Sequence, residues 1–263
     1  DGPPLHGPVL LRDAQAKTLN LNHWHAFMQC ISQAGYRRSE MISSKNALLY
    51  AYVFYLIGKC EYGIDHFTLK KTIARWFFMT TLTGRYTGSP ESIMEQDLAR
   101  LRSIDTAAEF VALLDRIIAA NFTDDYWNIT LPNDLATSSG SSPSLNAYPA
   151  ALNILDAEAL FSEVKIYDLL DPALHAVRNS VERHHLFPKK YLASLGIVET
   201  RETNQIANFA YVEWPDNISI SDTAPHDYWP KFAARFALDS AKLQRMHYWH
   251  ALPDGWYDLP YGD

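Results

Sequence analysis

The sequence predicts a mainly α-helical protein that ends in a small α+β segment. Three observations support this fold class. Apolar residues recur at helical spacing from about residue 21 to residue 122, as in helices with one buried face. Short segments that alternate apolar and polar residues, typical of strands, occur after about residue 177. The composition, with 48% hydrophobic and 20% charged residues, is that of a chain with a packed core.

Five helices are expected in the first half of the chain. The first three end at glycine- or proline-containing breaks, because these residues rarely continue a helix. The expected ranges are 21–34, 44–59, 66–82, 91–103 and 107–120. The longest apolar run has twelve residues, from 47 to 58. A membrane span needs about 18 or more, so we interpret this run as a buried helix and expect no membrane partner.

The remaining elements are shorter. The first twenty residues, which contain three prolines, are expected to form a leading segment. We place a soft boundary between residues 165 and 180, which gives a helical domain, 1–175, and a second domain, 176–263. The other expected elements are a loop at 137–144, helices at 148–161, 168–174 and 188–196, strands at 181–187 and 208–214, and closing helices at 230–238 and 240–251.

Charge and cysteine content restrict the functional class. The net charge is −7, from 23 Lys and Arg against 30 Asp and Glu. Taken alone, this argues against a general nucleic-acid binder, which usually has a basic balance. Residues 1–175 carry −5, residues 176–250 carry +1, and the last thirteen carry −3. The two cysteines, Cys30 and Cys60, exclude a disulfide framework and a cysteine-based zinc site, and they favour a reducing, cytoplasmic location.

One pattern of polar residues can carry chemistry. The adjacent pair His184 and His185 closes the first expected strand and precedes Leu-Phe-Pro. A proline turn there lets both imidazoles reach one site, whereas an unrelated His pair usually has one ring in solvent and one in a core hydrogen bond. Asn204, Asn208 and Asn217 follow within fourteen residues of one another. Taken singly, each asparagine is read as a turn former.

Together these residues resemble the ββα-metal pattern of the HNH, or His-Me finger, nucleases. The segments SVERHHLFPKKYL and NQIANFAYVEWPDNISIS are similar to the C-terminal nuclease module of GmrSD-type modification-dependent restriction endonucleases. Upstream segments resemble the helical region that precedes that module, so the resemblance covers about residues 20 to 235. It implies a helical bundle scaffold that carries a small C-terminal ββα-metal finger.

The resemblance also implies roles for four residues. His185 would be the general base, and Asn208 would hold the His-bearing strand or orient the imidazole. His184 and Asn217 would ligate one divalent cation. Asp is commoner in the family at the position of His184, so the metal stays open: Mg²⁺ or Mn²⁺ is favoured, and Ni²⁺ or Zn²⁺ also suits an imidazole ligand.

Contacts to DNA are harder to place. Basic side chains near the motif can meet phosphates, although a solvated helix face explains them about as well. The candidates are Lys189, Lys190, Lys231 and Arg235.

The sequence therefore predicts a metal-dependent DNA endonuclease, the C-terminal effector part of a restriction protein used in phage defence. Relatives carry an N-terminal ParB-like nucleotide-binding domain with a DGQQR-type motif, which does not occur here, so we expect this partner domain to be missing. One alternative is a non-cleaving DNA- or protein-binding regulatory module. A weaker alternative is a phosphodiesterase that acts on RNA or small nucleotides. The target modification and the oligomeric state stay open.

Overall fold

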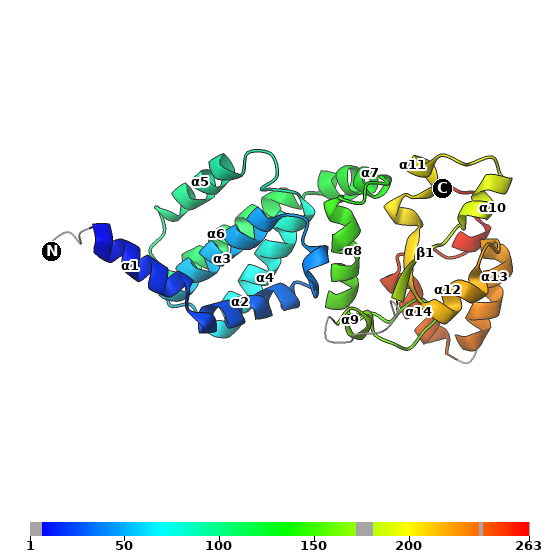
Figure 1. Cartoon of the computed structure of the whole chain (residues 1–263), viewed down its shortest axis with the longest axis horizontal. Helices are drawn as coiled ribbons and strands as arrows, with labels where there is room; N and C mark the ends of the chain where they lie inside the picture. Colours follow the sequence, from blue (N-terminus) through cyan, green and yellow to red (C-terminus); the bar gives the residue numbers. More distant parts are fainter. Residues whose placement is uncertain (1–6, 172–180, 237–238, 263) are drawn as a thin grey trace. The chain divides into compact units, whose positions relative to one another are not determined.

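The structure is a computed structural model that describes residues 7–171, 181–236 and 239–262. Within these ranges the protein is mainly helical, with one two-stranded sheet (Figure 1), which confirms the predicted fold class. The elements are α1 (Gly7–Thr18), α2 (Leu21–Gln33), α3 (Lys45–Cys60), α4 (His66–Leu82), α5 (Pro90–Leu101), α6 (Ala107–Asn121), α7 (Leu131–Leu135), α8 (Pro143–Ile154), α9 (Ile166–Leu169), β1 (Val181–His185), α10 (Lys189–Ser194), α11 (Thr200–Thr203), β2 (Phe209–Glu213), α12 (Trp214–Ile220), α13 (Pro225–Ala233) and α14 (Ser240–Trp249).

The chain divides into two compact units. The first comprises Asp1–Ala34 and Ile42–Thr123, and the second comprises Gly35–Met41 and Asp124–Asp263. Residues 124–171, which the sequence analysis assigned to the helical domain, thus pack with the second unit. The predicted boundary at residues 175 and 176 lies outside the described residues. Among the described helices, none is both long and apolar enough to cross a membrane.

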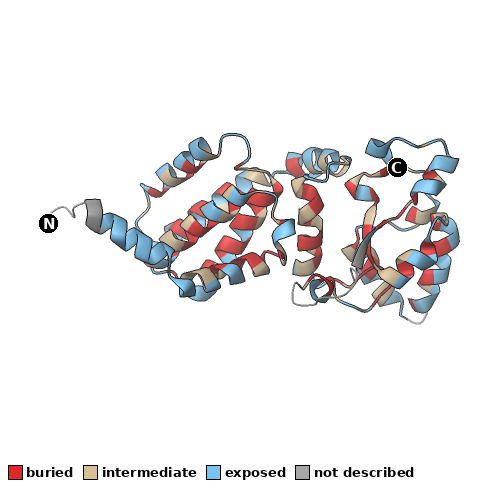
Figure 2. Cartoon of the chain, in the orientation of Figure 1, coloured by how far each residue is buried: buried red, intermediate tan, exposed pale blue. Residues whose placement is uncertain are grey.

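The first unit is built on α4, which packs against α2, α3 and α6. Its interior is aromatic, and Phe27, Phe54, Trp76 and Phe110 are fully buried. Figure 2 shows the buried positions along these helices in red. The helix starts carry side-chain caps, which satisfy backbone N–H groups that have no partner inside a helix. The caps are Asn20 for α2, Ser44 for α3, Asp65 for α4 and Thr106 for α6.

A buried charged cluster links the end of α4 to α5. Asp97 has no exposed surface, and its carboxylate accepts hydrogen bonds from Arg85 Nη2 at 2.6 Å, from Arg85 Nε at 2.9 Å and from the Tyr86 hydroxyl at 2.8 Å. Arg100 Nη1 adds a longer bond of 3.3 Å. Because a buried charge is costly unless it is paired, this arrangement ties the loop before α5 to one conformation.

The second unit centres on the sheet. Strands β1 and β2 are antiparallel, with His184 opposite Ala210 and His185 opposite Phe209. Helix α12 follows β2 directly, so the order is strand, strand, helix. A continuous apolar cluster supports this unit, and its largest members are Phe161, Tyr228, Trp229, Phe232 and Trp256.

Residues 35–41 join the second unit through specific contacts. Gly35 has φ +87°, and a Cβ there would lie 2.1 Å from the carbonyl oxygen of Ala150, so only glycine fits without strain. Arg37 pairs with Asp171 at 2.8 Å. The Arg38 guanidinium donates to the carbonyl oxygens of Leu170 and Leu169 at 2.7 and 3.0 Å.

Several expected elements differ in the structure. The helix expected at 168–174 is α9, and residues 172–174 lie outside the described residues. The closing helix expected at 230–238 begins earlier, as α13 at Pro225, and residues 237 and 238 also lie outside the described residues. The helix expected at 148–161 is α8, which begins earlier at Pro143, since proline suits a first helical turn, and ends at Ile154. Beyond it, the Leu160 N–H bonds to the carbonyl oxygen of Tyr211 at 2.8 Å, and this pairing draws the chain out of the helix. The expected leading segment contains α1, and Trp214, which the expected strand at 208–214 includes, begins α12.

Candidate functional site

Strand β1 positions the two adjacent histidines. Successive residues of a strand point to opposite faces, so His184 and His185 face different sides of the sheet. The strand end is fixed by Leu186, whose N–H bonds to the carbonyl oxygen of Asn208 at 2.9 Å. The carbonyl oxygen of Leu186 accepts the buried Tyr228 hydroxyl at 2.7 Å. Both imidazoles therefore project from a backbone that is held on each side.

His184 faces helix α12 and contacts Asn217. The distance from its Nδ1 to Asn217 Oδ1 is 2.7 Å, and only 4% of the residue is exposed. Since an amide oxygen accepts, Nδ1 donates in this pair, and Nε2 is left buried with no hydrogen-bond partner in the described part of the chain. Burial lowers the pKa of His184 to about 4. The ring is therefore neutral near pH 7.

His185 lies on the other face and contacts Asn204. Its Nε2 donates to Asn204 Oδ1 at 2.9 Å, which leaves the lone pair on Nδ1. Burial lowers the pKa of His185, and the positive charges of Lys189 and Arg183 act in the same direction against the opposing bond to Asn204. The ring is only partly buried and sits 4.7 Å from the Phe209 ring. A neutral, partly accessible imidazole suits a general base.

Asn208 holds the backbone rather than an imidazole. Its Oδ1 accepts from the Phe187 N–H at 2.8 Å, and its Nδ2 donates to the carbonyl oxygens of Phe187 and Thr203 at 3.1 and 3.0 Å. The resemblance left two tasks open for Asn208, to hold the His-bearing strand or to orient the imidazole. In the structure its side chain fixes the backbone just after that strand. Asn204, which the sequence analysis read as a turn former, makes the imidazole contact instead. No signal in the sequence distinguished these two asparagines.

The His184 and Asn217 pair fits part of a metal site. Neighbouring ligands of an octahedral cation with bonds of about 2.0–2.1 Å lie about 2.9 Å apart, close to the 2.7 Å between Nδ1 and Oδ1. No group of three or more His, Cys, Asp and Glu residues suited to a metal occurs among the described residues. In this structure His184 Nδ1 carries the proton that it donates to Asn217 Oδ1, so a cation could bind there only if that proton moved to Nε2, which has no hydrogen-bond partner among the described residues. The protein would then supply one nitrogen and one oxygen, and water or phosphate would complete the shell.

The predicted DNA contacts differ in availability. Lys189 and Lys231 are exposed and form no ion pair with the described carboxylates. Lys190 pairs with Asp222 at 2.5 Å, but its side chain is 80% exposed, and such surface pairs are weak. Arg235 is the least available, because Asp216 binds it at 2.9 Å and its guanidinium lies 4.4 Å from the Phe232 ring.

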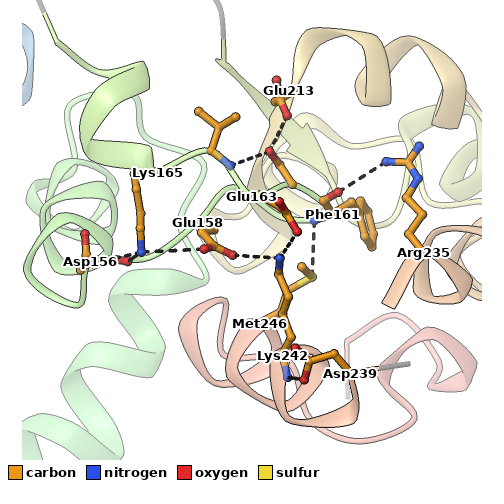
Figure 3. A network of polar contacts seen from close by, with 12 residues as sticks. Asp156, Glu158, Phe161, Glu163, Lys165, Glu213, Arg235, Asp239, Lys242 and Met246 are labelled. Carbon is orange, nitrogen blue, oxygen red and sulfur yellow. Dashed lines mark hydrogen bonds and ion pairs between the residues drawn. The ribbon is translucent and has the colours of Figure 1, made fainter. Parts of the chain in front are cut away.

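A polar network holds the segment that leads toward β1. Figure 3 shows Lys165 between Asp156 and Glu158, and Lys242 of α14 between Glu158 and Glu163. The distances from Lys165 are 3.0 Å to Asp156 and 3.8 Å to Glu158. In the same view, Arg235 also donates to the Phe161 carbonyl oxygen at 3.4 Å. Arg235 therefore serves this packing, and the structure gives it no free phosphate-binding geometry.

A third histidine, which the sequence analysis did not single out, is also buried and neutral. His250 Nε2 donates to the carbonyl oxygen of Glu158 at 2.9 Å, and Nδ1 accepts the Tyr148 hydroxyl at 3.1 Å. Burial lowers its pKa to about 4. With both ring nitrogens bonded inside the second unit, His250 is a structural residue.

Stability should fall as the pH is lowered from about 6.5 to about 4. His184 and His250 have folded pKa values of about 4, whereas an unfolded histidine titrates near 6.5. Between these values the unfolded state binds more protons, so acid favours unfolding by about 1.4 kcal/mol per pH unit for each histidine. Urea unfolding from pH 4 to pH 7.5 measures this slope.

A matched variant tests the source of that slope. His250→Gln should reduce this slope by the contribution of one histidine, about 1.4 kcal/mol per pH unit. A flat stability profile between pH 4 and pH 6.5 would contradict the expectation.

The candidate site thus has a His184 and Asn217 pair on one face of the sheet and a neutral His185 on the other, at the end of the same strand. The structure therefore does not bring the two imidazoles together as the sequence analysis expected, because both residues lie within β1, where successive side chains alternate between faces. These features come from this chain alone. Comparison of the chain with protein-family models, curated proteins and solved structures gives no match.

Proposed function

We propose that this chain is a metal-dependent endonuclease module that hydrolyses phosphodiester bonds in DNA. One observation carries the proposal: a nitrogen and an oxygen 2.7 Å apart lie beside a strand that also bears a neutral imidazole with a free Nδ1. Two antiparallel strands followed by a helix hold these groups. This combination supports the resemblance to the HNH nucleases that the motif first indicated.

Each residue has a defined task in this proposal. His185 Nδ1 takes the proton of the attacking water, whose oxygen forms the new bond to phosphorus while the bond to the leaving sugar oxygen breaks. Asn204 fixes the ring orientation and its tautomer, and Asn208 fixes the strand end. His184 and Asn217 would hold one divalent cation, which supplies a Lewis acid for the phosphate oxygens.

The biological setting follows from the resemblance. We propose that the chain is the effector part of a modification-dependent restriction protein, and that it works with a ParB-like nucleotide-binding domain. The net charge of +1 over residues 176–250 is compatible with a module that binds DNA weakly by itself.

Plasmid nicking tests the proposal. Supercoiled plasmid DNA and single-stranded RNA are each incubated with the full chain and Mg²⁺ or Mn²⁺. Parallel reactions contain a chelator. The proposal expects nicking of DNA that the chelator abolishes, and loss of nicking in His184→Ala and Asn217→Ala. Binding without metal-dependent cleavage would favour a regulatory module, and cleavage of RNA alone would favour the phosphodiesterase alternative; either outcome would overturn the proposal.

A further inference from the structure

Two adjoining cavities lie on the face of the second unit that carries His185. The smaller, about 200 Å³, is lined by Asn204 and Phe209, the two residues in contact with His185. The larger, about 420 Å³, is lined by Arg38 and Glu40 among others. Both are lined by Arg183 and by the loop at Gly140. Because they share these walls, the cavities lead from the candidate base to a second basic side chain.

Arg183 lies at the junction. It is two residues before His185 on β1, so it shares the face of His185 at a distance of about 6.6 Å along the strand. Its guanidinium is 5.5 Å from the Phe209 ring, and the His185 ring is 4.7 Å from the same ring. The strand pairing of Arg183 with Tyr211 fixes this register. Arg183 and His185 therefore flank one aromatic side chain.

The charge of Arg183 is not neutralised locally. Arg183 is exposed and forms no ion pair with any described carboxylate, whereas Arg37, Arg85 and Arg235 each bind an aspartate. The guanidinium of Arg38 is held by two carbonyl oxygens, so its charge is fixed in the wall. Glu40 is the one carboxylate among the lining residues. The walls of the two cavities thus carry two guanidinium groups and one carboxylate. This positive balance favours the binding of an anion in the cavities.

We propose that Arg183 binds a backbone phosphate of the nucleic-acid substrate, next to the phosphate at which His185 activates the attacking water. The assignment rests on the proposed function for the identity of the attacked group. A guanidinium suits this task because its planar N–H fork bonds two phosphate oxygens at once. The nucleic-acid strand would run along the two cavities, past the Ser138–Gly140 loop. Arg183 is thus a substrate-binding residue that no part of the motif identifies.

Salt-dependent binding tests the assignment without any cleavage. Fluorescently labelled single-stranded and duplex DNA oligonucleotides are titrated with the full chain in chelator, and anisotropy is read from 25 to about 200 mM salt. Arg183→Ala should weaken binding roughly tenfold at low salt and lower the slope of log K against log salt by about one. Arg183→Lys should restore part of the affinity, because it keeps the charge and loses the fork.

Arg116→Ala is the matched control, since Arg116 is an exposed arginine on α6 that forms no ion pair with the described residues. Its salt slope should equal that of the wild type. Four outcomes would each overturn the assignment. The salt slope could be unchanged in Arg183→Ala, or Arg116→Ala could lose as much DNA affinity as Arg183→Ala. The wild type could also fail to bind DNA, or polyglutamate could compete with DNA equally well. A wild type that binds through Arg183 but never cleaves would uphold it and refute the nuclease proposal.

Discussion

Replacing His185 with alanine should reduce metal-dependent nicking of DNA by about 10²- to 10⁴-fold, the usual contribution of a positioned general base. The expected loss is large because His185 combines a free Nδ1, partial access to solvent and a lowered pKa at the end of β1. Single-turnover nicking of supercoiled plasmid measures the rate. Circular dichroism melting checks that the variant is folded, as expected for a partly exposed side chain.

Two further variants separate catalysis from positioning. Asn204→Ala should lower the rate less, and it should move the acid limb of the pH–rate profile to lower pH, because its hydrogen bond raises the pKa of His185. His226→Ala removes a half-exposed histidine of the same unit and should leave the rate unchanged. Nicking by His185→Ala at the wild-type rate would remove the general base from the proposal.

Replacing Asp97 with alanine should destabilise the first unit by about 3–5 kcal/mol, the cost of leaving a buried charge without its partner. Asp97 has no exposed surface and accepts bonds from Arg85, Tyr86 and Arg100. Its removal leaves the Arg85 guanidinium, 15% exposed, and the buried Tyr86 hydroxyl without their acceptor. Urea unfolding followed by circular dichroism measures the change.

An exposed ion pair of the same unit provides the comparison. Arg75 and Asp115 are also 2.6 Å apart, but their side chains are 48% and 40% exposed. Asp115→Ala should therefore cost about 0–1 kcal/mol, because water solvates the remaining arginine. If the two variants were equally stable, burial would not be the source of the Asp97 effect.

Local signals explain which elements the sequence predicted well. Helix α4 was predicted at the residues that the structure shows, since Asp65 caps its start and Gly84 follows its end. The end of α8 was wrong because the apolar spacing continues past Ile154, while the chain leaves the helix to pair Leu160 with β2. Such pairing joins residues about fifty positions apart, and no local pattern contains it.

The candidate site shows the same limit. The motif identified His184, His185 and Asn217, and the structure brings His184 and Asn217 together. It did not identify Asn204, whose contact with His185 depends on the segment that leads to β2, or Arg183, whose surroundings depend on cavity walls formed by distant segments. From residue type alone, Asn204 is interpreted as a turn former and Arg183 as a surface cation.

The interleaving of the two units also has an evolutionary consequence. The chain leaves the first unit at Gly35, returns at Ile42 and leaves again after Thr123, so neither unit is a single uninterrupted stretch. One recombination event within the gene could not transfer the second unit whole, because residues 35–41 and their arginine contacts to Leu169, Leu170 and Asp171 would stay behind. The two units are therefore expected to have been inherited together, because an exchange of the continuous part of the second unit alone would lose these contacts.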